Sequence, residues 1–162
     1  MPNEEIERYR LSEGDVLLTE GGDWDKLGRA AIWRSEIALC LHQNHVFRVR
    51  SLRPELLLPE WIEMFANGPI GISYFQNAAK QTTNLASINM TQLRGCPLPI
   101  PAPAEQRRIV AKVHELMAIC GQLEASLVLT QADQARLLDS LLHEALAPER
   151  ALKSDPAMRT AA

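Results

Sequence analysis

The densest set of possible metal ligands in this sequence lies between positions 40 and 45. Cys40, His42 and His45 carry the thiol and imidazole groups that zinc prefers. Zinc usually takes four ligands, or three and a water, in a tetrahedral arrangement, and no fourth donor is spaced nearby. We therefore expect no metal site. Gln43-Asn44 instead predicts a turn between two strands, and a small metalloprotein is kept only as a third alternative.

Sequence motifs of nucleotide-dependent and hydrolytic enzymes are absent. The chain has no Gly-x-x-x-x-Gly-Lys-Ser/Thr loop, no Gly-x-Gly-x-x-Gly fingerprint and no Gly-x-Ser-x-Gly elbow. We expect a protein that is not an enzyme and has no cofactor of its own.

Side chains suited to nucleic acid occur in two stretches. Residues 76–84 are dense in Gln, Asn, Thr and Lys, which reach base edges and phosphates. A basic cluster with Glu36 as its single acid contains Lys26, Arg29, Arg34, Arg48, Arg50 and Arg53. The net charge of -3 argues against a general electrostatic grip on nucleic acid. A solvated face of strands explains the cluster equally well, and an ordinary loop explains residues 76–84.

Short elements precede the carboxy-terminal part of the chain and must position these side chains. Extended runs predict strands at Val16–Thr19, Gly28–Trp33, Ile37–Leu41 and Val46–Val49, with a flexible loop at Gly21-Gly22. Pro59 predicts a helix start and Gly68 its end, Ile70–Phe75 begins another short helix, and Cys96–Ile100 predicts an edge strand. The pattern indicates an α+β domain with a small, mostly antiparallel sheet or barrel.

A long amphipathic helix follows the proline-rich segment Leu98–Pro103. Pro103 suits a first helical turn, and Pro148 is the expected end. A 3.5-residue repeat, interrupted at Thr130 and Gln134, contains Ile109, Val113, Leu116, Cys120, Leu123, Leu127, Leu137 and Leu141. Such a repeat predicts dimerisation through a coiled coil.

The length of this helix decides whether the repeat can be buried within its own domain. Residues 104–146 span about 65 Å as a helix, whereas a 100-residue globule has a radius of gyration of about 13 Å. The helix is therefore expected to project and to pair with a second helix. The alternative is a hairpin broken near Gly121, although one glycine costs only about 1 kcal/mol in a helix.

The bulk properties are those of an intracellular protein. The 162 residues are 46% hydrophobic and 23% charged, and no run approaches the roughly 18 apolar residues of a membrane span. The acidic start Met1–Glu5 is unlike a signal peptide, and three scattered cysteines indicate no disulfide framework. We expect a cytoplasmic location without membrane association.

Several motifs together resemble a known family. Gly14–Thr19 followed by Gly-Gly, then Gly28–Trp33 and Cys40–Arg48, resemble the distal half of a target recognition domain in the specificity subunits of type I restriction-modification systems. Leu98–Val110 is similar to the junction between that domain and its spacer helix. The resemblance covers roughly Arg8 to Leu146.

The resemblance implies a non-catalytic subunit whose recognition domain reads one half of a bipartite site in double-stranded DNA. Long helices pair antiparallel in this family, as a homodimer or with another specificity subunit, and a methylation subunit and the restriction subunit assemble with them. S-adenosylmethionine and ATP would act only through those partners. The expected DNA-binding residues are Gly21, Gly22, Lys26, Arg29, Arg34, Gln43, Lys80, Gln81, Thr82 and Asn84.

The expected organisation is a partial recognition domain at 1–101, a spacer coiled-coil helix at 102–147 and a disordered or loosely ordered tail at 148–162. Recognition domains in the family are larger than the roughly 100 residues available here. We therefore expect the proximal part to be missing before Arg8. The chain would then be a partial gene product, a split-gene fragment or a regulator that competes with an intact specificity subunit. The competing class is a coiled-coil interaction protein that does not bind DNA itself.

Overall fold

The computed structural model of this chain describes residues 3–81 and 85–154, with side chains described at 4–80 and 85–146. The chain divides into two units, Met1–Val113 and His114–Ala162. The first unit is an α+β domain, and the second is formed by the greater part of one long helix, so the predicted fold class is confirmed.

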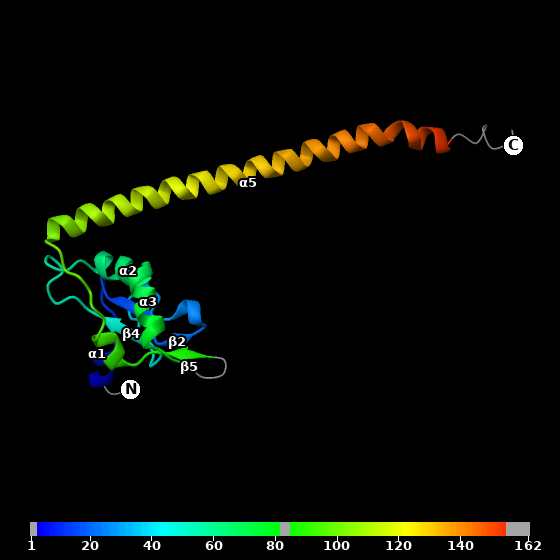
Figure 1. Cartoon of the computed structure of the whole chain (residues 1–162). Helices are drawn as coiled ribbons and strands as arrows, with labels where there is room; N and C mark the ends of the chain where they lie inside the picture. Colours follow the sequence, from blue (N-terminus) through cyan, green and yellow to red (C-terminus); the bar gives the residue numbers. More distant parts are fainter. Residues whose placement is uncertain (1–2, 82–84, 155–162) are drawn as a thin grey trace. The chain divides into compact units, whose positions relative to one another are not determined.

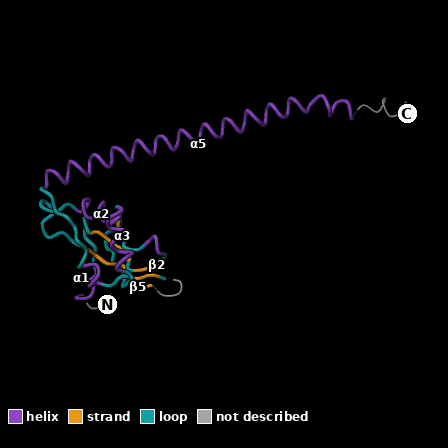
Figure 2. The backbone as a smooth tube through the Cα atoms, in the orientation of Figure 1, coloured by secondary structure: helices purple, strands orange, loops and turns teal. Residues whose placement is uncertain are grey.

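A three-stranded antiparallel sheet forms the centre of the first unit. Strand β1 (Val16–Thr19) lies between β3 (Ala30–Ile32) and β4 (Val46–Val49). Figure 2 draws the strands of the domain in orange. Val16 and Leu18 are 0% and 2% exposed, because alternate side chains of a strand point to the same face. This alternation fixes the register in which Leu18 faces Ala30 on one side and Phe47 on the other.

A second, smaller antiparallel sheet has the order β2-β6-β5. Its strands contain two residues each: β2 (Gly21–Gly22), β6 (Ala86–Ser87) and β5 (Lys80–Gln81). The predicted flexible loop at Gly21-Gly22 is therefore wrong, since this glycine pair is a strand of the sheet. A Cβ on Gly21 would lie 3.1 Å from the Ala86 carbonyl oxygen, which explains why a small residue stands there.

Short helices complete the domain (Figure 1): α1 (Asn3–Tyr9), the 3-10 helix η1 (Trp24–Lys26), α2 (Pro59–Asn67), α3 (Pro69–Ala78) and α4 (Met90–Arg94). Prolines begin both α2 and α3, where a missing N–H costs nothing. Helix α2 packs on β1 and β3. The core includes Val16, Leu18, Leu27, Phe47, Ile62, Phe75 and Ile88.

Gly28 permits a close approach between the segment that enters β3 and helix α3. Its φ is +64°, a conformation that side chains other than glycine rarely adopt. A Cβ at this position would lie 2.2 Å from Cδ2 of Phe75, which is 1% exposed. Glycine is therefore required at position 28, because any side chain there would overlap the Phe75 ring in the core.

Two predicted strands are absent from the described part of the chain. Residues 37–41 form only an isolated bridge between Leu41 and Arg10, and Ile37 remains 60% exposed. This apolar run extends neither β3 nor β4, the two edge strands of the central sheet. Residues 96–100 pair with no strand, because Pro97 and Pro99 lack the N–H that a ladder requires, and the Leu98 N–H donates locally to the Cys96 carbonyl at 2.9 Å.

Helix α5 (Pro103–Ser154) begins at the proline predicted to start it. It is continuous through Gly121, which excludes the hairpin alternative. It also continues past Pro148, so the expected end there is wrong; a proline removes one helical hydrogen bond without necessarily ending the helix.

Candidate nucleic-acid interface and pairing helix

The β2-β6-β5 sheet brings together two predicted DNA-binding segments that lie about sixty residues apart in the sequence. Gly21 and Lys80 both pair with Ser87, one from each side. Gly22 and Gln81 both pair with Ala86 in the next row. Lys80 is exposed, so its ammonium group lies on one outer strand of this sheet, β5. The other outer strand, β2, consists of two glycines and presents only its backbone.

The turn predicted around Gln43 lies beside this small sheet. The Glu20 backbone N–H donates to the His45 carbonyl oxygen at 3.1 Å, and His45 Nδ1 lies 3.2 Å from Glu20 Oε2. A hollow of about 520 Å³ is lined by Glu20, Gly21, Gly22, His45, Leu85, Ala86 and Ser87. Gln43 is exposed two positions before His45. The structure therefore groups the glycine pair, the turn and β5 on one side of the domain.

Lys26 lies in η1, shortly after β2, and forms an ion pair with Asp23. The hydrogen bond from its ammonium to the Asp23 carboxylate raises the pKa of Lys26 and lowers the pKa of Asp23. Both groups are largely exposed, so the pair stays accessible to solvent. A phosphate at this point would have to compete with the aspartate.

Arg29 and Arg34 lie at opposite ends of β3. The Arg29 backbone N–H donates to Thr19 Oγ1 at 3.1 Å, which places this exposed arginine beside the end of β1 that leads into β2. Arg34 follows Trp33, whose N–H donates to the Asp15 carbonyl at the other end of the central sheet. Arg29 therefore belongs with the small sheet, whereas Arg34 does not.

The remaining arginines of the basic cluster are engaged within their own domain. Arg48 Nη1 donates to the Arg10 carbonyl at 2.6 Å, and Arg53 pairs with Glu55. Arg50 binds Asp15 through two hydrogen bonds, from Nε to Oδ1 at 2.6 Å and from Nη2 to Oδ2 at 2.7 Å. These contacts support the structural explanation for this half of the cluster.

Asp15 is a buried carboxylate that the sequence did not mark as special. It is 0% exposed, and its Oδ2 also accepts the Ser12 backbone N–H at 2.8 Å. Burial alone raises the pKa of Asp15, but the hydrogen bonds and charge of Arg50, with the Ser12 bond, outweigh it and leave the pKa below its ordinary value. The charged form is thus the one that the fold stabilises.

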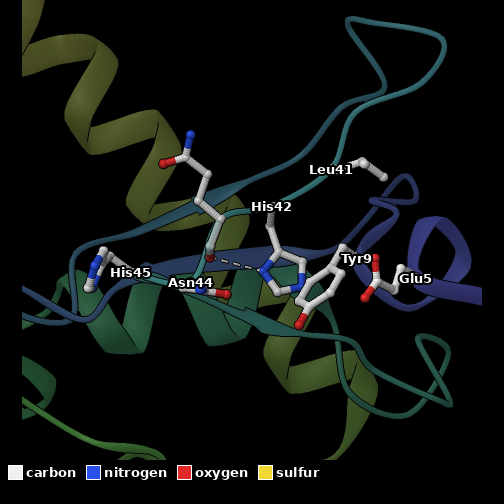
Figure 3. Close-up of a pocket in the computed structure, with 7 residues that line it drawn as sticks. Glu5, Tyr9, Leu41, His42, Asn44 and His45 are labelled. Carbon is white, nitrogen blue, oxygen red and sulfur yellow. Dashed lines mark hydrogen bonds between the residues drawn. The ribbon is translucent and has the colours of Figure 1, made fainter. Parts of the chain in front are cut away.

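The candidate metal ligands do not converge. His42 Nδ1 lies 3.2 Å from the Val46 carbonyl, and its ring meets that of Tyr9 edge to face, with centroids 5.3 Å apart. Figure 3 shows this pair among the residues that line an open hollow of about 670 Å³; His45 lines another part of the same hollow, and its ring does not meet that of His42. Over residues 3–81 and 85–154, no group of three His, Cys, Asp or Glu side chains is arranged to hold a metal ion.

Thr82 and Asn84 lie outside the described residues, as does the side chain of Gln81. The predicted contacts at these three positions therefore have no structural description.

Gln106 ties the start of α5 to the domain, a role that sequence reasoning missed. This side chain is 0% exposed, accepts the Leu58 N–H at 3.0 Å and donates to the carbonyls of Leu56 and Pro101 at 2.9 and 2.8 Å. Val110, one turn later, is 7% exposed. No sequence signal separates this glutamine from an ordinary surface residue, because polar side chains are mostly exposed.

The predicted pairing stripe changes character along α5. Ile109 and Val113 are half-buried within the first unit, whereas every later member is exposed. The exposed fractions are 49% for Leu116, 60% for Leu123, 62% for Leu127, 64% for Leu137 and 61% for Leu141. Covering each such leucine would contribute about 1–2 kcal/mol. The stripe from Leu116 onward is thus a surface available to a second helix.

The chain thus combines a small α+β domain with one long helix that carries an exposed leucine stripe. It is similar to the specificity subunits of type I restriction enzymes. The chain is 27% identical over 149 residues to the specificity subunit of the type I restriction enzyme EcoKI of Escherichia coli strain K12 and 23% identical over 150 residues to that of EcoEI from Escherichia coli. The EcoBI specificity subunit of the same species is 24% identical over 147 residues.

These matches cover 90% of this chain but only 25% of the EcoEI subunit, 31% of the EcoKI subunit and 29% of the EcoBI subunit. No family model matches the chain. The chain is therefore related to part of a type I specificity subunit, and the resemblance predicted from its motifs is confirmed.

In the described segments, none of the helices combines the length and apolar character needed to span a bilayer. Helix α5 is long enough, but charged residues recur along it.

Proposed function

We propose that this chain is a non-catalytic DNA-recognition component of a type I restriction-modification system. Its domain would read one half of a bipartite site in double-stranded DNA, and α5 would pair antiparallel with a second copy or with another specificity subunit. A methylation subunit, and with it the restriction subunit, would dock on this assembly in the cytoplasm. Methyl transfer and translocation, with S-adenosylmethionine and ATP, would belong to those partners.

The grouping on the β2-β6-β5 sheet is the observation that carries this proposal. Lys80, the glycine pair and the turn at Gln43 occupy one side of the domain, with Arg29 at its margin. Exposed glycine backbone admits a close approach of a nucleic-acid strand, and flanking cations neutralise phosphates. The first part of the chain would be a partial recognition domain, and α5, which continues to Ser154, would be the spacer helix.

Binding to duplex DNA by the complex with a methylation subunit tests this function. Fluorescence anisotropy measured across a salt series gives both affinity and salt slope. Lys80→Ala should weaken binding to all sequences and reduce the slope by about 1, as expected for one lost phosphate contact. Arg53→Ala is the matched control, because it removes the same charge from an arginine paired with Glu55. Equal affinity for Lys80→Ala and the unmodified protein would contradict the proposal.

A second candidate is an interaction protein that assembles with a specificity subunit, or competes with it, without binding DNA. The net charge of -3 and the pairing of Lys26 with Asp23 favour it. The same titration separates the two candidates, because this protein would enter the complex while leaving its DNA affinity independent of Lys80 and Arg29.

A further inference from the structure

The polar interruption in the stripe of α5 lies at a centre of symmetry. We call the positions of the 3.5-residue repeat the seam. Counting outward from residue 132, the seam positions on either side fall at equal distances: Thr130 and Gln134, Leu127 and Leu137, Leu123 and Leu141, and Cys120 and Glu144. A helix with this property matches its own reversed copy.

We infer that two copies of α5 pair antiparallel in one register, with the dyad axis at residue 132. This inference rests on the proposed pairing function and specifies its geometry. Thr130 then faces Gln134 of the second copy, and leucine layers 127 with 137 and 123 with 141 follow on both sides. Layers that alternate the two seam positions in this way satisfy knobs-into-holes packing.

Hydrogen bonding in the central layers is complementary. Thr130 Oγ1 donates its proton to the Ser126 carbonyl at 2.9 Å within the helix, so its oxygen is left to act as an acceptor. The carboxamide of Gln134 carries N–H donors that suit this acceptor across the interface. Because the dyad repeats the contact, both polar side chains of each copy gain a partner.

Neighbouring registers lose this match. A shift of one heptad in either direction sets Thr130 opposite Leu127 or Leu141 and sets Gln134 opposite Leu123 or Leu137. Gln134 would then be buried against a leucine without a hydrogen-bond partner across the interface, and the Thr130 oxygen would lose its donor from the second copy, which is unfavourable. Polar seam residues fix register for this reason.

The charge of Asp133 near the dyad axis is balanced by an arginine of the same helix. The two copies of Asp133 approach each other beside the axis, and like charges would repel. Arg136 Nη1 lies 3.4 Å from Asp133 Oδ1 on the same helix and supplies a counter-charge to each copy.

The native Cys120 makes the register measurable in the full chain. Glu144→Cys places a thiol in the layer of Cys120 of the second copy, so mild oxidation should give a covalent dimer linked between residues 120 and 144. His143→Cys is the matched control, because the adjacent position points away from the seam. Light scattering before oxidation reports pairing, and mass mapping of linked peptides identifies the bond.

The expected result is a dimer in all three proteins and a 120-to-144 link only in Glu144→Cys. Three results would overturn the register. A link between two copies of Cys120 in the unmodified chain indicates parallel helices, which also contradicts the proposed antiparallel pairing. A dimer in which Glu144→Cys links no better than His143→Cys leaves the pairing intact and refutes the register alone. A monomer refutes both the register and the pairing of α5 with a second copy of this chain.

Discussion

Gln106→Leu should destabilise the domain even though it makes the chain more hydrophobic. The substitution keeps the volume but removes three hydrogen bonds, one from the Leu58 N–H and two to the carbonyls of Leu56 and Pro101. At about 1 kcal/mol for each bond, the free energy of unfolding should fall by about 3 kcal/mol. Small domains have only about 5–15 kcal/mol in total, so the effect is large.

Urea titration followed by tryptophan fluorescence measures this loss. Trp61 reports on the same junction, because it is 8% exposed and its indole Nε1 donates to the Pro99 carbonyl at 2.8 Å. With a slope of about 1.5 kcal/mol per molar urea, the midpoint should fall by about 2 M. Gln122→Leu, at an exposed position of α5, is the control and should change stability by less than about 0.5 kcal/mol. An unchanged midpoint for Gln106→Leu would refute this account of the junction.

Three further substitutions test the seam, the buried ion pair and the close approach in the core. Leu123→Asp puts a charge into the seam and should convert the dimer to monomer, measured by light scattering; a dimer of unchanged size would argue against the pairing helix. Asp15→Asn removes the charge that binds Arg50 and should cost about 1.5–3 kcal/mol at pH 7. Because the pKa of Asp15 is lowered in the folded state, this stabilisation is complete above its unfolded pKa of about 4 and is lost as pH falls through the folded value. Urea titrations at pH 7 and pH 2 should therefore show that the free energies of unfolding of the variant and the parent converge in acid. An equal difference between the two proteins at both pH values would contradict the lowered pKa of Asp15. Gly28→Ala should lower the melting temperature, since it combines a positive φ with a clash against Phe75, at a cost of about 1–3 kcal/mol; an unchanged melting temperature would show that the ring yields freely.

Local signals in the sequence predicted the elements that carry them. Pro59 and Gly68 bracket α2, Pro103 begins α5, and short apolar runs mark β1 and β4. Each of these signals acts within a few residues, through a missing N–H or a short run of strand-forming side chains, so it is visible without knowing the tertiary structure.

Features that depend on distant segments were missed. The β2-β6-β5 sheet has strands of two residues, too short for any periodicity, and Gly21 meets Ser87 only in the folded chain. The apolar run at 37–41 had the composition of a strand, but in the fold it forms only the bridge between Leu41 and Arg10. Asp15 and Gln106 are polar groups whose burial depends on partners more than thirty positions away.

The DNA-binding role of the predicted residues stays a prediction, but the fold brings some of them together. Gly21, Gly22 and Lys80 were chosen from separate stretches and lie in one small sheet. Composition could not distinguish Arg29, which lies beside the small sheet, from Arg50, whose guanidinium binds the buried carboxylate of Asp15.

The brevity and edge position of β5 have an evolutionary consequence. This strand contributes two residues to a sheet separate from β1, so replacing it leaves the alternation of Val16 and Leu18 undisturbed, whereas β6 contributes the buried Ala86 to the core. Substitutions can accumulate at this edge without disturbing the scaffold that holds it. Such an arrangement would allow the residues at this edge of the domain to vary between related proteins while helix α5 is retained.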